Sequence, residues 1–175
     1  NVPFSYTPYG AIEKEIHFVL DGTEIGVVKT STSGIPASYT IPAQSYGAHL
    51  LEVYMTAEIN GNTIESDHIF KDILWFDDTS DVPVIGTVYQ NFTARQYDAT
   101  NIEYTVYDPS TDTPTIQIAV DNEVVSTPTL ETATNVYTFK TDVVGKHTIT
   151  ITCGETVKTL TANITELNID ISPVT

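Results

Sequence analysis

The sequence predicts an all-β protein built from two tandem antiparallel β-sandwiches, and three observations lead to this fold class. Thr, Val, Ile and Tyr alternate with period two along most of the chain, whereas a helical period is nearly absent. Turn signals recur at intervals of roughly 8 to 12 residues, which is typical of sandwiches. The second half of the chain repeats the first, which indicates one module present twice.

The repeat is visible as matched segments whose spacing changes slowly. Ile16–Gly22 matches Ile116–Asn122 at an offset of 100 residues, and Gly47-Ala48-His49 matches Gly145-Lys146-His147 at an offset of 98. Further matches are Tyr39–Ile41 with Tyr137–Phe139 at 98, Gly61 with Gly154, Trp75 with Asn168 and Asp77 with Asp170 at 93, and Pro83–Val84 with Pro173–Val174 at 90. A drifting offset indicates a copied module with loops of different length, and the last match predicts the start of a third copy.

The repeat also sets the expected domain boundaries. We expect one sandwich over residues 1–80 and a second over residues 83–172, joined by a short polar linker. Asn1 matches Asn101, so the first copy is expected to lack a counterpart of the segment from Pro83 to Thr100, which has the pattern of an opening strand. The first sandwich should therefore lack its N-terminal strand and leave a sheet edge open to strand donation.

Alternation and turn dipeptides locate the strands of the first copy. Asp21-Gly22 and Asn60-Gly61 accept the positive φ of two-residue hairpin turns, so each is expected to join two strands. After Gly47, odd-numbered residues such as Leu51 and Val53 should face the core, and even-numbered residues such as Tyr54 should face solvent. The predicted strands are Val2–Tyr6, Glu15–Asp21, Glu24–Lys29, Ser38–Ile41, Ala48–Ile59 and Thr63–Phe76.

Composition and charge exclude several functions. Of the 175 residues, 7 are Lys or Arg and 23 are Asp or Glu, which gives a formal net charge of −16. Nucleic acid is not an expected partner, because binding to phosphates requires clustered cations. No membrane partner is expected either, since no apolar run approaches the roughly 18 residues of a membrane span. The single cysteine, Cys153, continues the period-two series of Ile149 and Ile151, which predicts a small core residue rather than a reactive thiol.

The four histidines are the natural candidates for catalysis or metal binding, and the repeat argues against both roles. His49 and His147 occupy one position in two copies, two residues after a glycine, so we expect a hydrogen bond that serves the fold. The other two have no histidine counterpart: His17 matches Gln117, and His68 matches Thr161. No histidine pair has metal-ligand spacing, and no nucleophile or phosphate-loop motif is present. We therefore assign no catalytic, metal or cofactor-binding residue and do not expect an enzyme.

Three other features leave alternatives open. Asp77, Asp78 and Asp81 predict a solvated acidic linker, with a calcium site as the alternative, because hard cations prefer oxygen ligands. Tyr54 is expected to be either an ordinary surface tyrosine or part of a contact patch for a sugar or a protein. Trp75, whose match in the second copy is polar, is predicted to lie outside the core of the repeat and to cover the junction between the modules.

The pattern Tyr-Thr-Ile/Phe, then Gly-x-His, alternating apolar residues and a glycine hairpin resembles the tandem Ig-like modules of bacterial surface proteins and phage virion proteins. Many of those modules carry Gly-x-Tyr where this chain has Gly47-x-His49 and Gly145-x-His147. Ile35–His49 and Ile102–Pro109 resemble segments of long, repeat-rich phage structural proteins. The resemblance covers nearly the whole chain and implies an Ig-like sandwich in each copy.

The same resemblance implies a non-enzymatic structural or adhesive module that acts as a spacer or decoration on a phage virion, a tail fibre or a bacterial surface. The expected partners are other subunits or repeats of the same assembly and a cell-surface glycan or protein, bound weakly and multiplied by repetition. The expected location is the virion surface or the extracellular, bacterial cell surface. The alternative is a carbohydrate-binding accessory module of a secreted hydrolase.

Overall fold

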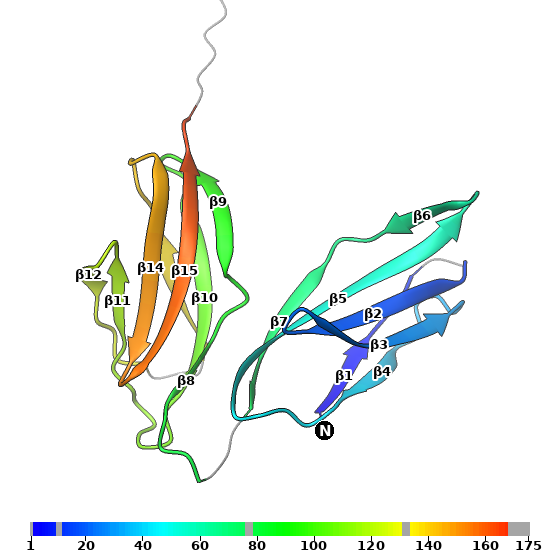
Figure 1. The fold of residues 1–175 in the computed structure, drawn as a ribbon, viewed down its shortest axis with the longest axis horizontal. Coiled ribbons are helices and arrows are strands. Elements are labelled where there is room, and N and C mark those ends of the chain that lie inside the picture. The colour runs from blue at the N-terminus through cyan, green and yellow to red at the C-terminus, as the bar shows by residue number, and fades with distance from the viewer. Residues whose placement is uncertain (1, 10–11, 76–78, 131–133, 168–175) are drawn as a thin grey trace, which may run out of the picture. The chain divides into compact units, whose positions relative to one another are not determined.

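A computed structural model describes residues 2–9, 12–75, 79–130 and 134–167. Within these ranges the chain forms strands β1 to β15, and it contains no helix of the length and apolarity needed to cross a membrane. The chain divides into two compact units, Asn1–Asp77 and Asp78–Thr175, and each unit has its own hydrophobic core (Figure 1).

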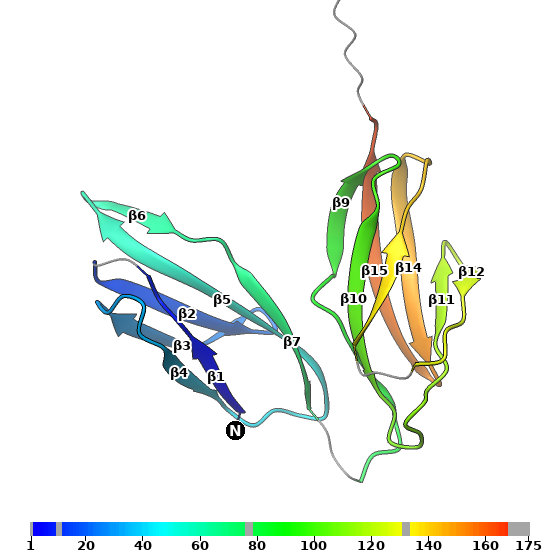
Figure 2. The same cartoon turned by 180° about the vertical axis from the view of Figure 1, so that it is seen from behind.

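The second unit is a sandwich of a three-stranded and a five-stranded sheet (Figure 2). The three-stranded sheet has the order β13 (Thr134–Phe139), β10 (Thr100–Tyr107) and β8 (Val84–Gly86). The five-stranded sheet has the order β12 (Glu123–Ser126), β11 (Gln117–Val120), β14 (Gly145–Cys153), β15 (Thr156–Thr165) and β9 (Asn91–Arg95). All neighbours are antiparallel except β9 and β15, which are parallel. The opening segment of this unit therefore serves both sheets, β8 in one and β9 in the other.

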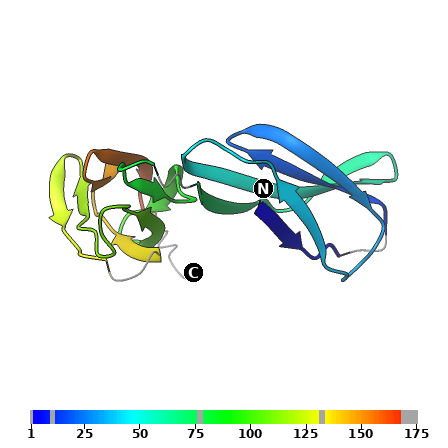
Figure 3. The ribbon, with the colours of Figure 1, turned by 90° about the horizontal axis from the view of Figure 1, so that it is seen from below.

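The first unit has the same plan with fewer strands (Figures 1 and 3). One layer is the pair β1 (Val2–Tyr6) and β4 (Ala37–Ile41). The other layer contains β3 (Thr23–Thr30), β2 (Lys14–Leu20) and β5 (Gly47–Ile59), with β6 (Asn62–Glu65) and β7 (Ile69–Trp75) paired to successive parts of β5. Among the described residues, no strand takes the place that β8 and β9 hold in the second unit. Two antiparallel Ig-like sandwiches, the first without its N-terminal strand, confirm the predicted fold class.

Alternating residues fill both cores, as period-two strands require. On β5, Leu51 and Val53 are buried, and on β14 Ile149, Ile151 and Cys153 are buried, which confirms the predicted inward face. The second core is the larger one because both layers are complete, and burial stabilises by about 25 cal/mol per Å² of apolar surface. The predicted hairpin turns are confirmed by positive φ angles of 50° and 78° at Asp21 and Gly22, and of 53° and 77° at Asn60 and Gly61.

The predicted strand Thr63–Phe76 is wrong, because two strands occupy this segment. β6 pairs with the last residues of β5, and β7 pairs with its first residues. Between them, the Ser66 amide donates to the carbonyl of Met55, and the Ser66 hydroxyl accepts from the Met55 amide. These two bonds hold the chain in a local excursion that a continuous strand would not allow. Phe76 lies outside the described residues.

Strand register also corrects the alignment of the two copies. Trp75 lies opposite Gly47, as Ile164 lies opposite Gly145, so Trp75 corresponds to Ile164 and not to Asn168. The offset of 93 at Gly61 therefore falls to 89 at Trp75, because the excursion inserts four residues into the first unit. Asp72 is opposite Leu50 as Thr161 is opposite Thr148, so Thr161 is not the counterpart of His68, which lies in the insertion.

The start of the repeat shifts as well. Tyr39 pairs with Phe4, and the matching Tyr137 pairs with Ile102, so the offset along β1 is 98 rather than 100. The sequence Tyr6-Thr7-Pro8-Tyr9 is thereby equivalent to Tyr104-Thr105-Val106-Tyr107. This shift makes Thr7–Tyr9 the counterpart of the residues that pair with β8 in the second unit.

Candidate functional site

The two equivalent histidines each hold a corner of their sandwich, as predicted. His147 Nδ1 donates to Asp121 Oδ2 at 2.7 Å, and His147 Nε2 donates to the carbonyl of Val143 at 2.9 Å. The second oxygen of Asp121 accepts the amide of Thr148 at 2.8 Å, and the amide of Asp121 donates to the carbonyl of the same Thr148. The turn after β11 and the start of β14 are thus joined by one carboxylate and one imidazole.

The same contacts recur in the first unit with closely similar distances. His49 Nδ1 donates to Asp21 Oδ2 at 2.6 Å, and His49 Nε2 donates to the carbonyl of Ser45 at 2.9 Å. Asp21 Oδ1 accepts the amide of Leu50 at 2.8 Å. The bond from the histidine to a carbonyl four residues upstream is the bond that a tyrosine makes at the corresponding corner of immunoglobulin domains. We name the two sites, Asp21–His49 and Asp121–His147, the corner pairs.

The chemistry of the corner pairs fixes their charge. A carboxylate and a carbonyl can only accept hydrogen bonds, so both ring nitrogens of each histidine must carry a proton. The hydrogen bond to Asp121 raises the pKa of His147, although burial opposes the change. Burial likewise opposes the shift at His49, but its bonds to Asp21 and Ser45 together raise the pKa. The Thr148 amide and then His147 lower the pKa of Asp121. Each corner pair is therefore an ion pair whose nitrogens are committed to the fold.

A second cluster lies on the outward face of the first unit, and its members were predicted only as separate residues. The phenol ring of Tyr54 lies between the imidazoles of His17 and His68, with ring centroids 4.7 and 4.4 Å apart and ring planes within 7° and 6° of parallel. Phe70 continues the series beyond His68, at 6.4 Å. We name His17, Tyr54, His68 and Phe70 the ring stack. Strand pairing of His17 with Tyr54 positions the first two rings, and the four-residue insertion brings the third.

Glutamates hold the imidazoles of the ring stack in place. His17 contacts Glu24 Oε2 through Nδ1 and Thr56 Oγ1 through Nε2, both at 2.9 Å. His68 contacts Glu52 through Nδ1 and Glu65 through Nε2. Its hydrogen bonds to those two glutamates raise the pKa of His68. Because both nitrogens of His68 face carboxylates, this ring too is a cation with no nitrogen free for chemistry.

The ring stack decides what Tyr54 can contact. Sugars and partner rings bind tyrosine through its flat faces, and here both faces of Tyr54 are covered by imidazoles. Only the ring edge and the hydroxyl reach solvent. The second unit has Gln117 and Thr152 at the positions of His17 and Tyr54, so this cluster belongs to the first unit alone. The sequence signal for it was the placement of His17 and Tyr54 on the same face of adjacent strands.

A shallow groove of about 480 Å³ lies beside the ring stack, along the ends of β2 and β5. Its rim carries Glu13, Glu15 and Glu58, and Glu15 is held by an ion pair with Lys29 at 2.5 Å. Hydrogen bonding to that lysine, followed by its charge, lowers the pKa of Glu15. Within the described ranges, no three His, Cys, Asp or Glu side chains gather closely enough to hold a metal ion.

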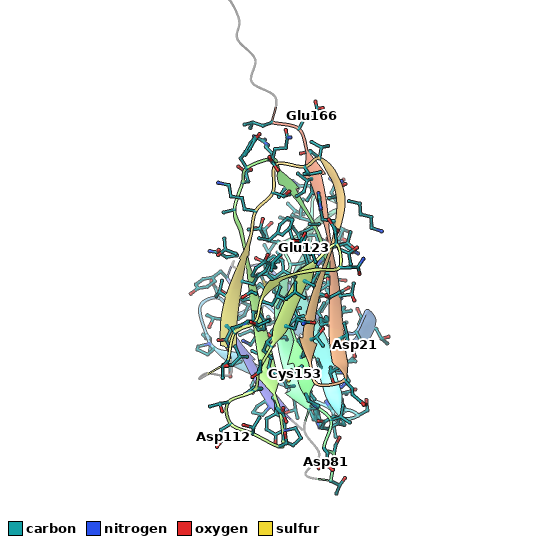
Figure 4. All side chains as sticks on the ribbon, turned by 90° about the vertical axis from the view of Figure 1, so that its left-hand side faces the viewer. Asp21, Asp81, Asp112, Glu123, Cys153 and Glu166 are labelled. Atoms are coloured by element: carbon teal, nitrogen blue, oxygen red, sulfur yellow. The ribbon has the colours of Figure 1, made fainter. Side chains whose placement is uncertain are left out.

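The remaining predicted residues occupy ordinary structural positions. Cys153 is buried, with Sγ 3.8 Å from Asp108 Oδ2 (Figure 4). Burial, followed by the nearby charge of Asp108, raises the pKa of the Cys153 thiol to about 11, so little thiolate forms at neutral pH. Asp81 is exposed, whereas Asp77 and Asp78 lie outside the described residues, so the solvated linker and its calcium alternative stay predictions.

Trp75 differs from its predicted role. It occupies the strand position that Ile164 fills in the core of the second unit, so the prediction of a residue outside the repeat's core is wrong. Its indole lies edge-on to the imidazole of His49, with ring centroids 6.4 Å apart and the ring planes perpendicular. In the first unit, Trp75 therefore packs beside a corner pair.

Comparisons with known proteins give the following matches. No protein-family model and no curated protein matches the chain. Among solved structures, fibronectin(III)-like modules of Clostridium thermocellum CbhA align with 17% identity over 99% of this chain and 90% of theirs, with a TM-score of 0.41. A chimeric titin Z1Z2 tandem aligns with 16% identity over 95% and 91%, with a TM-score of 0.35. Domains 4 and 5 of the S-layer protein SbsC align with 14% identity over 89% and 72%, with a TM-score of 0.34.

Proposed function

We propose that this chain is a non-enzymatic structural and adhesive module that acts as a spacer or decoration on a phage virion, a fibre or a bacterial surface. One observation carries the proposal. All four histidines have both ring nitrogens engaged by fold contacts: His17 with Glu24 and Thr56, His49 with Asp21 and Ser45, His68 with Glu52 and Glu65, and His147 with Asp121 and Val143. An acid or base must be able to exchange a proton with a substrate, and these groups are not available for that exchange.

Further observations support a mechanical role. The longest strands of each unit, β5 and β14, run through the middle of their sheets and pair on both sides. Each corner pair ties the start of such a strand to a turn of the preceding hairpin, which stiffens the end of the sandwich. A net charge of −16 favours solubility of a displayed protein. Repetition of small rigid units then sets reach and allows weak contacts to add up.

Stretching single molecules tests the spacer role. A chain with two independent units should unfold in two steps, and each step should release roughly 270 Å of chain, since an extended residue spans about 3.3–3.6 Å. Antibodies against the chain should also label intact particles or cells in electron micrographs. Unfolding in one step, or label confined to the cell interior, contradicts the proposal.

A glycan array separates this function from that of a carbohydrate-binding module. The spacer role predicts no saturable binding. Binding that is lost in Tyr9→Ala or Tyr97→Ala, whose side chains are exposed, would instead favour the accessory module of a hydrolase. Tyr54→Ala is the matched control, because both faces of that ring are already covered.

A further inference from the structure

The first unit contains a groove between its two layers, with a volume of about 540 Å³. It runs between β1 on one side and the paired strands β5 and β7 on the other. Its apolar lining consists of Phe4, Tyr6, Ile16, Val53, Met55 and Ile69. Ile69 faces this groove with 65% of its surface exposed, although it lies opposite the buried Val53 in the strand register. An isoleucine on the core side of a sheet is normally covered.

The second unit shows what covers the equivalent positions. By strand register, Tyr6 corresponds to Tyr104 and Val53 to Ile151. Tyr104 and Ile151 are fully buried, whereas Tyr6 is only partly buried. The difference comes from the segment Pro83–Gln96, which forms β8 and β9 and packs Tyr89 and Phe92 against the core. The first unit has the receiving surface without the segment that fills it.

The backbone edges beside the groove are those that the segment would use. In the second unit, β8 pairs with Thr105–Tyr107, which correspond to Thr7–Tyr9. β9 runs parallel to Thr161–Thr165, which correspond to the free edge of β7 from Asp72 onward. In the part of the chain that the structure describes, β1 pairs only with β4, and β7 pairs only with β5. Such edges are templates for strand addition.

Charge also favours this type of occupant. Residues 1–77 contain ten Asp or Glu against three Lys, whereas Pro83–Gln96 contains Arg95 and no acidic residue. A segment of this kind therefore approaches an acidic unit without repulsion.

We propose that the groove of the first unit accepts an extended strand donated by another polypeptide, with the apolar pattern of Pro83–Gln96. The donated strand pairs antiparallel with Thr7–Tyr9 and then parallel with β7, and its apolar side chains cover Tyr6, Met55 and Ile69. The proposal rests on the proposed function, because it names the neighbouring subunit of a surface assembly as the donor.

The test uses the full chain and a synthetic peptide with the sequence Pro83–Gln96. We expect saturable 1:1 binding in calorimetry, and a thermal transition of the first unit that rises with peptide concentration. The single tryptophan, Trp75, lies on β7, so its fluorescence follows the first unit. Hydrogen exchange should slow at Thr7–Tyr9 and along β7. A scrambled peptide should have no effect.

A matched pair of variants locates the site. Ile69→Asp places a charge in the groove and should weaken binding at least tenfold, while Ile35→Asp should leave binding unchanged. Both side chains are already exposed, at 65% and 59%, so neither change removes core packing. Absence of saturable binding, equal binding by the two variants, or altered exchange at Thr105–Tyr107 instead of Thr7–Tyr9 would overturn the proposal. These results would leave the two-step unfolding and the surface labelling intact, so failure of the donor strand is distinguishable from failure of the spacer role.

Discussion

Removal of the Asp121 carboxylate should destabilise the second unit selectively. In Asp121→Ala, the amide of Thr148 loses its acceptor and the imidazolium of His147 loses its ion-pair partner. A neutral hydrogen bond contributes about 0.5–1.5 kcal/mol to stability, and one to a charged group contributes about 1.5–3 kcal/mol. The Asp121 side chain is 51% exposed, so water compensates for part of the loss. We therefore expect a cost of about 2 kcal/mol, which lowers the melting temperature by roughly 8–16 °C in a unit of this size.

The pH dependence of this cost follows from the two pKa shifts. The pKa of His147 is raised, so its contribution is complete below the ordinary value of 6.5 and is lost as the pH rises through the raised pKa. The pKa of Asp121 is lowered, so its contribution is present above 3.8 and is lost as the pH falls through the lowered pKa. The difference between wild type and Asp121→Ala should accordingly be largest between pH 3.8 and 6.5 and should shrink in alkali.

Thermal unfolding measured with two probes gives the assay. Circular dichroism follows both units, whereas fluorescence of Trp75 follows the first unit alone. Asp121→Ala should shift only the transition that fluorescence does not detect, and Asp21→Ala should shift the fluorescence transition. Asp112→Ala, in an exposed loop, is the control and should change little (Figure 4). A cost below 0.5 kcal/mol, or an equal cost at pH 5.5 and pH 9, would refute the charged corner pair.

Three further predictions concern packing and reactivity. Ile151→Ala leaves a cavity in the second core and should cost about 2–5 kcal/mol by denaturant unfolding, whereas Val157→Ala on the exposed face should cost under about 0.5 kcal/mol; similar costs would contradict the assigned faces. Gly26→Ala should destabilise the first unit by about 1–3 kcal/mol, because a Cβ there would meet the Tyr39 hydroxyl at 2.2 Å and that ring is fixed by stacking on Phe18; an unchanged Trp75 transition would show that the ring can yield. Cys153 should react with a thiol reagent at neutral pH only after unfolding, since burial raises its pKa to about 11; fast reaction of the native chain would contradict that burial.

Local pattern was sufficient for the elements whose contacts are sequential. The strand faces on β5 and β14 follow from alternation, and the turns at Asp21-Gly22 and Asn60-Gly61 follow from residue types that accept positive φ. The corner role of His49 and His147 followed from duplication alone. The length of the insertion before β7 was not accessible in the same way, because matched residues on its two sides are separated by a stretch without a counterpart. The misplacement of Trp75 came from that stretch.

The sequence by itself determined that this protein is a duplicated all-β sandwich, which residues face its cores, and that its conserved-in-both-copies histidines serve the fold. Only the tertiary structure decided that His17, Tyr54 and His68 stack into one cluster, and that Tyr6, Met55 and Ile69 line an open groove. The physical reason is the range of the interactions. Side-chain direction along a strand repeats every two residues and can be read locally, whereas contacts between strands depend on register and on insertions that sum over the whole chain.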